Sequence, residues 1–206
     1  IDPAITAPVY RSIFEAARNS EGGATIVASV VDASDVRLIK AVFAGSGASR
    51  SGSVSLVFDR IAGTGKRDAL ATSLRTIRRL NPTRHDMIFL VDGDTRVPAS
   101  LVAKSAPFFT DEKMGALTSD EVSDATGGRL FQDWFHLRFA QRQLMMSSMG
   151  LSERVLTLTG RMSVFRGDLA TQPGFISGVQ HDFIDHWRFG RVNFLTGDDK
   201  STWFWL

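Results

Sequence analysis

The sequence predicts an α/β fold in which a mostly parallel central sheet is covered by helices on both faces. Short apolar runs that suit buried strands alternate along the chain with segments that suit helices. Acidic residues follow directly after several of these runs, as in residues 30–34 and 91–95. Ligands of such sheets bind at the carboxyl ends of the strands, so these acidic residues are the first candidates for a functional site.

The first half of the chain contains three predicted strands with helices between them. The strands are short and apolar, and we expect them at residues 24–31, 54–58 and 87–91. The helices are expected at residues 35–43, 68–80 and 98–109. Ser34 can cap the first helix, and Pro98 can begin the last. Residues 45–52 (GSGASRSG) are expected to form a flexible loop.

The second half is expected to begin with a short strand at residues 115–118 and a mobile polar segment at 119–128. Residues 130–149 predict a long helix with apolar residues spaced along it. The remaining expectations are a strand, a turn and a strand over 155–165, a loop over 172–180 followed by a short helix, and a last strand over 192–195. The 206 residues are expected to form a single domain.

The composition excludes several classes of protein. Hydrophobic residues make up 43% of the chain and charged residues 22%, as in ordinary globular proteins. There is no cysteine, which excludes disulfides and thiolate zinc sites. The formal net charge of +2 is too small to indicate nucleic-acid binding, although it is compatible with an anionic ligand.

No run of about 18 apolar residues occurs, so no segment of this sequence is expected to cross a bilayer. The chain begins at Ile1 and stops at Leu206 after three aromatic residues, and we interpret both ends as cuts in a longer protein. The final aromatic residues are expected either to lead into a membrane-surface helix or to form a strand packed in the core.

An apolar run leads straight into Asp92-Gly93-Asp94. Two carboxylates on a turn at the end of a strand form an oxygen-rich site. Together with phosphate oxygens, such a site suits Mg²⁺ or Mn²⁺. The same tripeptide also forms ordinary β-turns, so by itself it leaves both interpretations open.

A glycine-rich segment, residues 63–70 (GTGKRDAL), stands between a predicted strand and a helix. Such loops present backbone N–H groups to phosphates, and Lys66 adds a positive charge. A P-loop is excluded, because Arg60 and Arg67 stand where that motif has glycine and Ser or Thr. A looser pyrophosphate loop and a plain helix start both remain open. Asp32 is expected either to bind a ribose or base or to cap a helix.

Charged residues also stand in two later segments. In residues 195–201 (LTGDDKS), Asp198 or Asp199 suits the general base that takes a proton from an attacking hydroxyl. The alternative is a pair of favourable charges at a helix N-terminus. In the run TGRMSVFR, Arg161 and Arg166 suit a phosphate or carboxylate, or lie at the rim of a buried strand.

The segment HDFIDHW at residues 181–187 offers a metal-site interpretation. Its two His–Asp pairs have the four-residue spacing that places side chains on one helix face, as zinc ligands often are. We favour an exposed helix or a gating loop near an acceptor instead. Tryptophans stack on sugar rings in some sites but are more often simply packed, and both interpretations apply to Trp134, Trp187, Trp203 and Trp205.

Taken in order, these segments resemble the catalytic domain of processive family 2 glycosyltransferases. The order is an acid after a strand near residue 32, GKRDAL, a strand leading into DGD, TGR-x-S-x-F-R and finally TGDD. Cellulose, hyaluronan and alginate synthases belong to this family, and the wording TGRMSVFR is most similar to alginate polymerase. The resemblance runs from about residue 24 to the end, and the order and spacing are more specific than any single segment.

The resemblance implies a GT-A type fold, with a nucleotide-binding half at about residues 1–95 and an acceptor half at about 96–206. It implies an inverting transfer of a sugar from a nucleotide-sugar donor to a growing polysaccharide acceptor, with GDP-mannuronate and alginate as the favoured pair. The implied place is the cytoplasmic face of the inner (plasma) membrane, with attachment through segments absent from this chain. Subunits of a secretion complex are implied as partners, and nucleic acid is not.

By the same resemblance, Asp32, Lys66 and Asp92 would bind the donor. Asp92 and Asp94 would bind Mg²⁺ or Mn²⁺, which neutralises charge on the departing nucleoside diphosphate.

The acceptor side is implied in the same way. Asp199 would be the catalytic base, with Asp198 as its neighbour. The acceptor sugar would be bordered by Thr159, Gly160 and Arg161. Basic residues near this place would favour an anionic sugar such as a uronate, namely Arg161, Arg166 and Lys200.

The sequence departs from the family pattern near both ends. The family opens with a strand ending in a Pro-Ala-Tyr-Asn-Glu type motif, whereas only residues 6–10 (TAPVY) stand near that place. The family also has a Q-x-x-R-W motif just beyond the base, and this sequence stops before that place. The missing opening motif leaves an alternative, a degenerate glycosyltransferase-like domain that binds nucleotide or a partner without catalysis. A phosphatase of the haloacid dehalogenase type is disfavoured, because Thr95 stands one position too early for D-x-D-x-T.

Overall fold

The computed structural model describes residues 2–152, 155, 157–158, 161–193 and 197–206. The elements in chain order are α1 (Pro3–Arg18), β1 (Ala24–Val30), α2 (Ala33–Gly45), α3 (Ala48–Ser51), β2 (Val54–Arg60), α4 (Lys66–Arg79), β3 (Met87–Val91), α5 (Leu101–Ser105), the 3-10 helix η1 (Ala106–Thr110), β4 (Ala116–Thr118), α6 (Arg129–Gly150), β5 (Met162–Arg166), α7 (Gly167–Ala170), α8 (Pro173–His181), β6 (Phe183–His186), β7 (Gly190–Asn193) and α9 (Asp198–Phe204).

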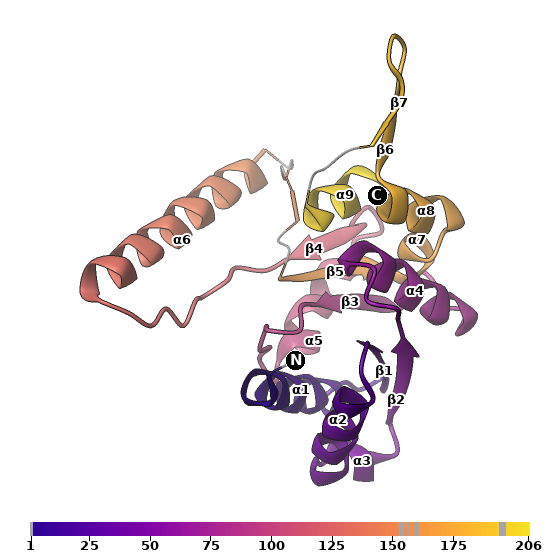
Figure 1. Ribbon diagram of the computed structural model, residues 1–206, viewed down its shortest axis with the longest axis vertical. Helices are drawn as coiled ribbons and strands as arrows, with labels where there is room; N and C mark the ends of the chain where they lie inside the picture. The colour runs from indigo at the N-terminus through magenta and orange to yellow at the C-terminus, as the bar shows by residue number, and fades with distance from the viewer. Residues whose placement is uncertain (1, 153–154, 156, 159–160, 194–196) are drawn as a thin grey trace.

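The predicted α/β class is confirmed, and the mixture of a parallel pair with packed helices is consistent with a GT-A type fold (Figure 1). Fewer strands pair in parallel than the sequence predicted. It joins β1 to β2, from Ala24 opposite Val54 to Val30 opposite Arg60. A second sheet has the order β3-β5-β4, in which β5 runs antiparallel to both neighbours. Its central strand therefore returns against the direction of β3 and β4, after the chain has passed through α6.

The strand β5 is buried along its whole length and separates two parts of the core. All five of its residues are buried. Phe165 packs in a cluster with α4 and α8, whereas Val164 packs in a cluster with α1 and α5. A third cluster joins α1 and α2 to the β1–β2 pair around Phe14 and Ile39. Since α4 contacts β1 and packs in one cluster with Ile88 of β3 and Phe165 of β5, it links the β1–β2 pair to the β3-β5-β4 sheet.

The helix α1 was not anticipated from the sequence, and residues 6–10 lie within it rather than in a strand. Its start follows ordinary capping rules, because the Asp2 side chain accepts a hydrogen bond from the Ala4 backbone N–H at 2.9 Å. Pro3 occupies the first turn, where a missing N–H costs nothing. The buried side chains of Val9 and Phe14 then hold the helix against the core.

Two further expectations in the first half need correction. Residues 45–52 are not simply a loop, because α3 forms a helical turn inside them. The helix expected at 98–109 begins at Leu101, whose N–H donates to the Pro98 carbonyl at 3.0 Å, and then tightens into η1. Pro107 explains the change, because its ring removes a donor from the helical ladder.

The expectations for residues 172–191 are wrong in two places. The expected loop at 172–180 is the helix α8, which Pro173 begins and which buries Phe175 and Val179. The short helix expected after it is instead the antiparallel hairpin of β6 and β7. The last strand, expected over 192–195, is confirmed at residues 192 and 193 within β7, and the rest of its expected range lies outside the described residues.

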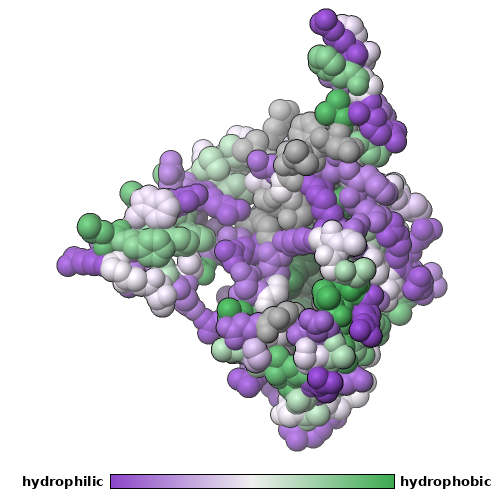
Figure 2. Space-filling model, in the orientation of Figure 1, coloured by the Kyte–Doolittle hydropathy of each residue, from purple (hydrophilic) through white to green (hydrophobic). Residues whose placement is uncertain are grey.

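The long helix α6 was anticipated and projects from the rest of the molecule (Figure 1). None of its residues is buried. Apolar side chains on its visible face are interspersed with polar ones (Figure 2). The segment before it is bonded to it, because Glu121 pairs with Arg142 at 3.3 Å and Asp120 accepts from Gln143 at 2.9 Å. Among the described residues, no helix is both long enough and apolar enough to cross a membrane.

Tyr10 is the single tyrosine of the chain, and burial together with the charge of Asp35 raises its pKa to about 12. The unfolded chain ionises this phenol from its ordinary value of 10.0, while the folded chain stays protonated. Above pH 10 the unfolded state therefore binds fewer protons, so the free energy of unfolding falls as pH rises. We expect a loss of about 2 to 3 kcal/mol by pH 12.

Urea unfolding of wild type and Tyr10→Phe between pH 9 and 12 measures this loss. The wild-type protein should lose that stability relative to Tyr10→Phe, because only the tyrosine contributes to the difference. Parallel stability curves for the two proteins would contradict the prediction.

Candidate functional site

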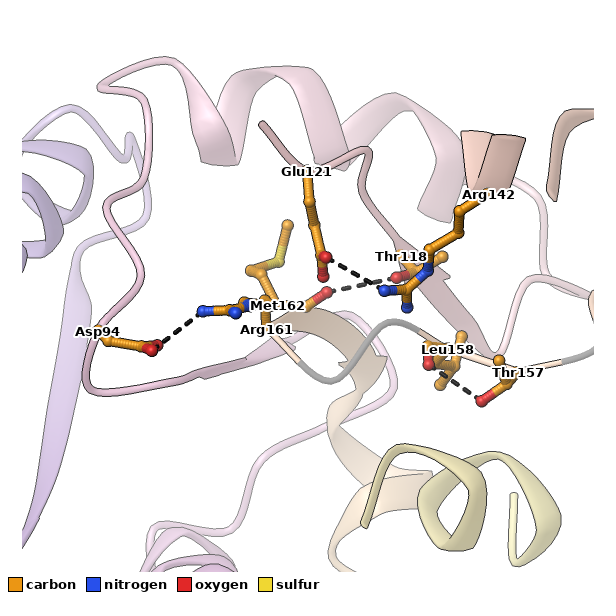
Figure 3. Close-up of polar contacts among 8 residues, drawn as sticks. All are labelled: Asp94, Thr118, Glu121, Arg142, Thr157, Leu158, Arg161 and Met162. Atoms are coloured by element: carbon orange, nitrogen blue, oxygen red, sulfur yellow. Dashed lines mark hydrogen bonds and ion pairs between the residues drawn. The ribbon is translucent and has the colours of Figure 1, made fainter. Parts of the chain in front are cut away.

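The Asp92-Gly93-Asp94 turn lies directly beyond β3, as predicted, and faces the start of β5. Val91 pairs with Met162, and the Asp92 backbone N–H extends this pairing to the carbonyl of Arg161 at 2.9 Å. The two strand ends are therefore fixed against each other. As a result, the guanidinium of Arg161 lies 3.0 Å from the carboxylate of Asp94 (Figure 3).

The second carboxylate of the turn contacts the start of α4. The ammonium of Lys66 lies 2.7 Å from Asp92, and both side chains remain partly open to solvent. Gly65 precedes this lysine with φ 126°, a backbone conformation that favours glycine. Two predicted site residues from different halves of the chain, Lys66 and Arg161, thus meet the two aspartates of one turn.

The glycine-rich loop lies beside the end of β1. Ile61 donates its backbone N–H to the Val30 carbonyl at 2.9 Å, and a Cβ on Gly63 would stand 3.7 Å from Val31. Asp32 follows at once, at the N-cap position of α2, and its side chain makes no capping hydrogen bond. The capping interpretation of Asp32 therefore holds for its position but not for its side chain, and its donor-binding role stays a prediction.

A cavity of about 450 Å³ lies at the start of α4 and is lined by residues 64–68 together with Gln180 and Gly197. Hydrogen bonds from Thr64 and Gln180 hold the pKa of Asp68 below its ordinary value of 3.8. The bond from Gln180 measures 2.9 Å and joins α4 to α8. The cavity therefore combines backbone N–H groups of a helix start, a lysine and an arginine, a combination that suits an anion.

The predicted base region lies across this cavity from α4. The structure places the backbone of Asp198 and Asp199 in the first turn of α9, after Gly197. This agrees with the helix-start interpretation and leaves the catalytic one untested, because their side chains fall outside the described part. The acceptor residues Thr159 and Gly160 also lie outside the described residues.

Arg166 does not belong to the site, which corrects its assignment as an anion-binding residue. Its side chain is buried, and its guanidinium donates to the backbone carbonyls of Met114, Arg84, Phe109 and Asp111. Four of the five N–H donors of this guanidinium are taken by backbone carbonyls, and the side chain is buried away from the Asp92–Asp94 turn. Arg166 instead ties the segments around β4 to β5.

The metal interpretation of residues 181–187 is also wrong. The shared helix face does not exist, because α8 ends at His181 and the next residues form β6. Asp185 instead pairs with Arg191 across the hairpin at 3.0 Å, and His186 accepts backbone N–H groups of the turn. Among the described residues, no group of three or more His, Asp or Glu side chains gathers as a ligand set.

The four tryptophans differ in exposure. Trp187 at the hairpin turn is 88% exposed, and Trp134 on α6 is half exposed. Trp205 is packed instead, because a Cβ on Gly178 of α8 would lie only 2.3 Å from its ring. The packing interpretation therefore applies to Trp205, and sugar stacking by the others stays a prediction.

Sequence reasoning missed a buried group beside the cavity. Asp182 is 4% exposed, lies 2.8 Å from the Arg67 guanidinium and accepts a 2.8 Å hydrogen bond from Ser201. The glycine-rich segment predicted a role for Lys66 but none for the next residue, Arg67. The local signal for Asp182 was its place in the segment HDFIDHW, where it was considered as a metal ligand.

Comparison with known proteins identifies the family. The profile for glycosyltransferase-like family 2 matches residues 3–206. The chain belongs to this family. Two curated relatives are named Glycosyltransferase alg8: that of Pseudomonas syringae pv. tomato (strain ATCC BAA-871 / DC3000) is 46% identical over 207 residues, and that of Azotobacter vinelandii is 45% identical over 207.

Each of these alignments covers 100% of this chain and 42% of the relative, so the chain spans less than half of their length. No solved structure is significantly similar to it. The predicted resemblance to family 2 glycosyltransferases is thus confirmed. The individual roles of the site residues stay predictions, which the geometry above now makes specific.

The contrast between two arginines of this family 2 domain is testable. We expect Arg166→Met to lower the free energy of unfolding by about 3 kcal/mol or more, because several buried carbonyls lose their donor. Arg161→Met removes an exposed ion pair and should cost less than about 1 kcal/mol. Denaturant unfolding measures both, and equal losses would contradict the structural role of Arg166.

Proposed function

We propose that this chain is the catalytic domain of an inverting glycosyltransferase that transfers a sugar from a nucleotide-sugar donor to a growing polysaccharide. The observation that carries the proposal is the meeting of Lys66 and Arg161 at the Asp92–Asp94 turn. Family membership and the relatives named Glycosyltransferase alg8 support the same class of reaction.

The donor diphosphate is assigned to the start of α4. Residues 64–68 line a cavity there, and the N-terminus of a helix attracts phosphate through its free N–H groups. Lys66 reaches from this helix to Asp92, so it can exchange that carboxylate for a phosphate oxygen when the donor binds. Asp32, beside the same loop, is assigned to the nucleoside.

Asp92 and Asp94 would hold Mg²⁺ or Mn²⁺, and their environment fits such an ion. Two carboxylates on one turn, with room for water and phosphate oxygens, are a usual protein contribution to a magnesium site. Both are partly exposed, and each lies against a side-chain cation in the structure. The ion would supply charge neutralisation to the departing nucleoside diphosphate.

Asp199 is assigned as the general base. In an inverting transfer the acceptor hydroxyl oxygen bonds to the anomeric carbon, the bond from that carbon to the diphosphate breaks, and the base takes the hydroxyl proton. Gly197, which precedes the first turn of α9, lines the cavity proposed for the donor, and this position supports the assignment. Arg161 and the segment before it, with Thr159 and Gly160, would border the acceptor sugar.

The proposed donor and product are GDP-mannuronate and alginate. The segment TGRMSVFR is most similar to that of alginate polymerase, and the curated relatives carry the name alg8. Because Arg166 has a structural role instead, Arg161 and Lys200 are the basic residues proposed to favour a uronate. The proposed place is the cytoplasmic face of the inner membrane, with partner subunits in a secretion complex. The alternative, a degenerate domain that binds without catalysis, predicts nucleotide binding without transfer.

Calorimetric titration with UDP, GDP and ADP, each with and without Mn²⁺, tests the donor and metal assignments together. We expect metal-dependent binding of GDP, and at least a tenfold weaker affinity in Asp92→Asn and Asp94→Asn, since each loses a carboxylate ligand. Asp185→Asn is the control matched to Asp94, because the Asp185 side chain is 64% exposed against 57% for Asp94 and also pairs with an arginine. Unchanged affinity of both site variants in Mn²⁺ would exclude the metal assignment.

Sugar transfer by the full-length protein tests the base. Asp199→Asn should bind the donor within about twofold of wild type but lower kcat by roughly 10²- to 10⁴-fold, the usual contribution of a general base. Asp198→Asn provides the neighbouring carboxylate as a control. Full transfer activity in Asp199→Asn would remove it as the base, and donor binding without any transfer by wild type would favour the degenerate domain.

A further inference from the structure

Asp182 is a buried carboxylate to which none of the steps above gives a role. It lies between α8 and β6, is 4% exposed and has φ 42°, ψ 75°. Left-handed backbone is uncommon outside glycine and persists where the surroundings determine it. A buried charge is also costly unless it is paired and hydrogen-bonded. Both features indicate that specific contacts hold this residue in place.

Those contacts come from two other helices. The Arg67 guanidinium lies 2.8 Å from Asp182 Oδ2 and also donates to the Val179 carbonyl at 3.2 Å. The hydroxyl of Ser201, itself 1% exposed, donates to the same Oδ2 atom at 2.8 Å. One carboxylate oxygen therefore joins the first turn of α4, the end of α8 and the body of α9.

The two partners stand next to residues with proposed chemical roles. Arg67 directly follows Lys66, which is assigned to the donor diphosphate. Ser201 lies two residues after Asp199, within the same short helix. Gly197 and the start of α4 line one cavity, so the distance between the two helix starts decides how donor and base face each other.

We propose that Arg67, Asp182 and Ser201 form a positioning network, which holds the first turn of α9 at a fixed place relative to the first turn of α4. This rests on the proposed function. The three residues act through their neighbours: the network sets where the base stands relative to the donor. Misplacement of a reacting group by about 1 Å can lower a rate by about 10²-fold, so such a network controls the rate of transfer.

The alternative is that the network only stabilises the fold, and a second anchor of α9 allows the two to be separated. Trp205 at the end of α9 packs on Gly178, where a Cβ would stand 2.3 Å from the ring. In Ser201→Ala this contact remains, as does the ion pair of Asp182 with Arg67. The helix should therefore stay docked while its first turn loses its link to Asp182.

Sugar transfer, donor binding and thermal unfolding of the full-length Ser201→Ala protein provide the test. We expect kcat to fall at least about tenfold, with KM for the donor and the affinity for its nucleotide within about twofold of wild type. The matched control is Thr171→Ala, which also removes a buried hydroxyl; this one donates to the Gly167 carbonyl at 2.6 Å, at the other end of α7. This control should lose stability and retain kcat.

A second variant keeps the test independent of the first. Asp182→Asn preserves the shape of the side chain and removes its charge, so it should also lower kcat. The double variant Ser201→Ala/Asp182→Asn should have a kcat no lower than that of the slower single variant, because the effects of substitutions within one network do not add.

Each outcome decides between the proposals. The positioning role would be overturned if Ser201→Ala kept the wild-type kcat, or if Ser201→Ala and Thr171→Ala lost kcat equally. Either result would leave the glycosyltransferase assignment intact. Absence of transfer by wild type would overturn the proposed function and the network with it.

Discussion

The antiparallel pairing of β3 with β5 is the contact on which the candidate site depends. Because β5 is buried on both faces, a one-residue shift of register would move Phe165 and Val164 out of their own core clusters and onto the opposite faces. The register therefore places Met162 opposite Val91 and brings Arg161 to the turn after β3. Two segments about 70 residues apart in sequence thus meet at the Asp92–Asp94 turn, although α6 lies between them in the chain.

Burial assigns opposite tasks to residues of the same type in this region. Arg161 directly precedes β5 and Arg166 ends it, yet Arg161 pairs with an exposed carboxylate and Arg166 is enclosed by backbone carbonyls. The same contrast separates Asp94, which is open to solvent, from Asp182, which is paired inside the core. Charges that are open to solvent remain available for exchange with a ligand, whereas the enclosed ones hold segments of the fold together.

This division gives the proposed reaction a physical basis. The donor needs groups that can leave their partners when a diphosphate arrives, and the Lys66–Asp92 pair at the cavity edge meets that need. The base needs a fixed place, and α9 is held by Ser201 in its middle and by Trp205 at its C-terminal end. A transferase site of this kind combines exchangeable surface ion pairs with buried contacts that do not move.

The sequence by itself determined the α/β class, the three strands of the first half, the long helix α6 and the order of motifs that marks family 2. These depend on local periodicity and on short spacings, which a sequence displays directly. Three features depend on the tertiary structure and were not predicted from the sequence. Residues 172–180, rich in glycine and proline, form a helix because Gly178 admits the Trp205 ring against it. The four-residue His–Asp spacing of residues 181–187 does not place side chains on one helix face, because this segment belongs to the β6–β7 hairpin. The partners of Asp182 could not be predicted either, because Arg67 lies more than a hundred residues away and long-range contacts leave no periodic trace in the sequence.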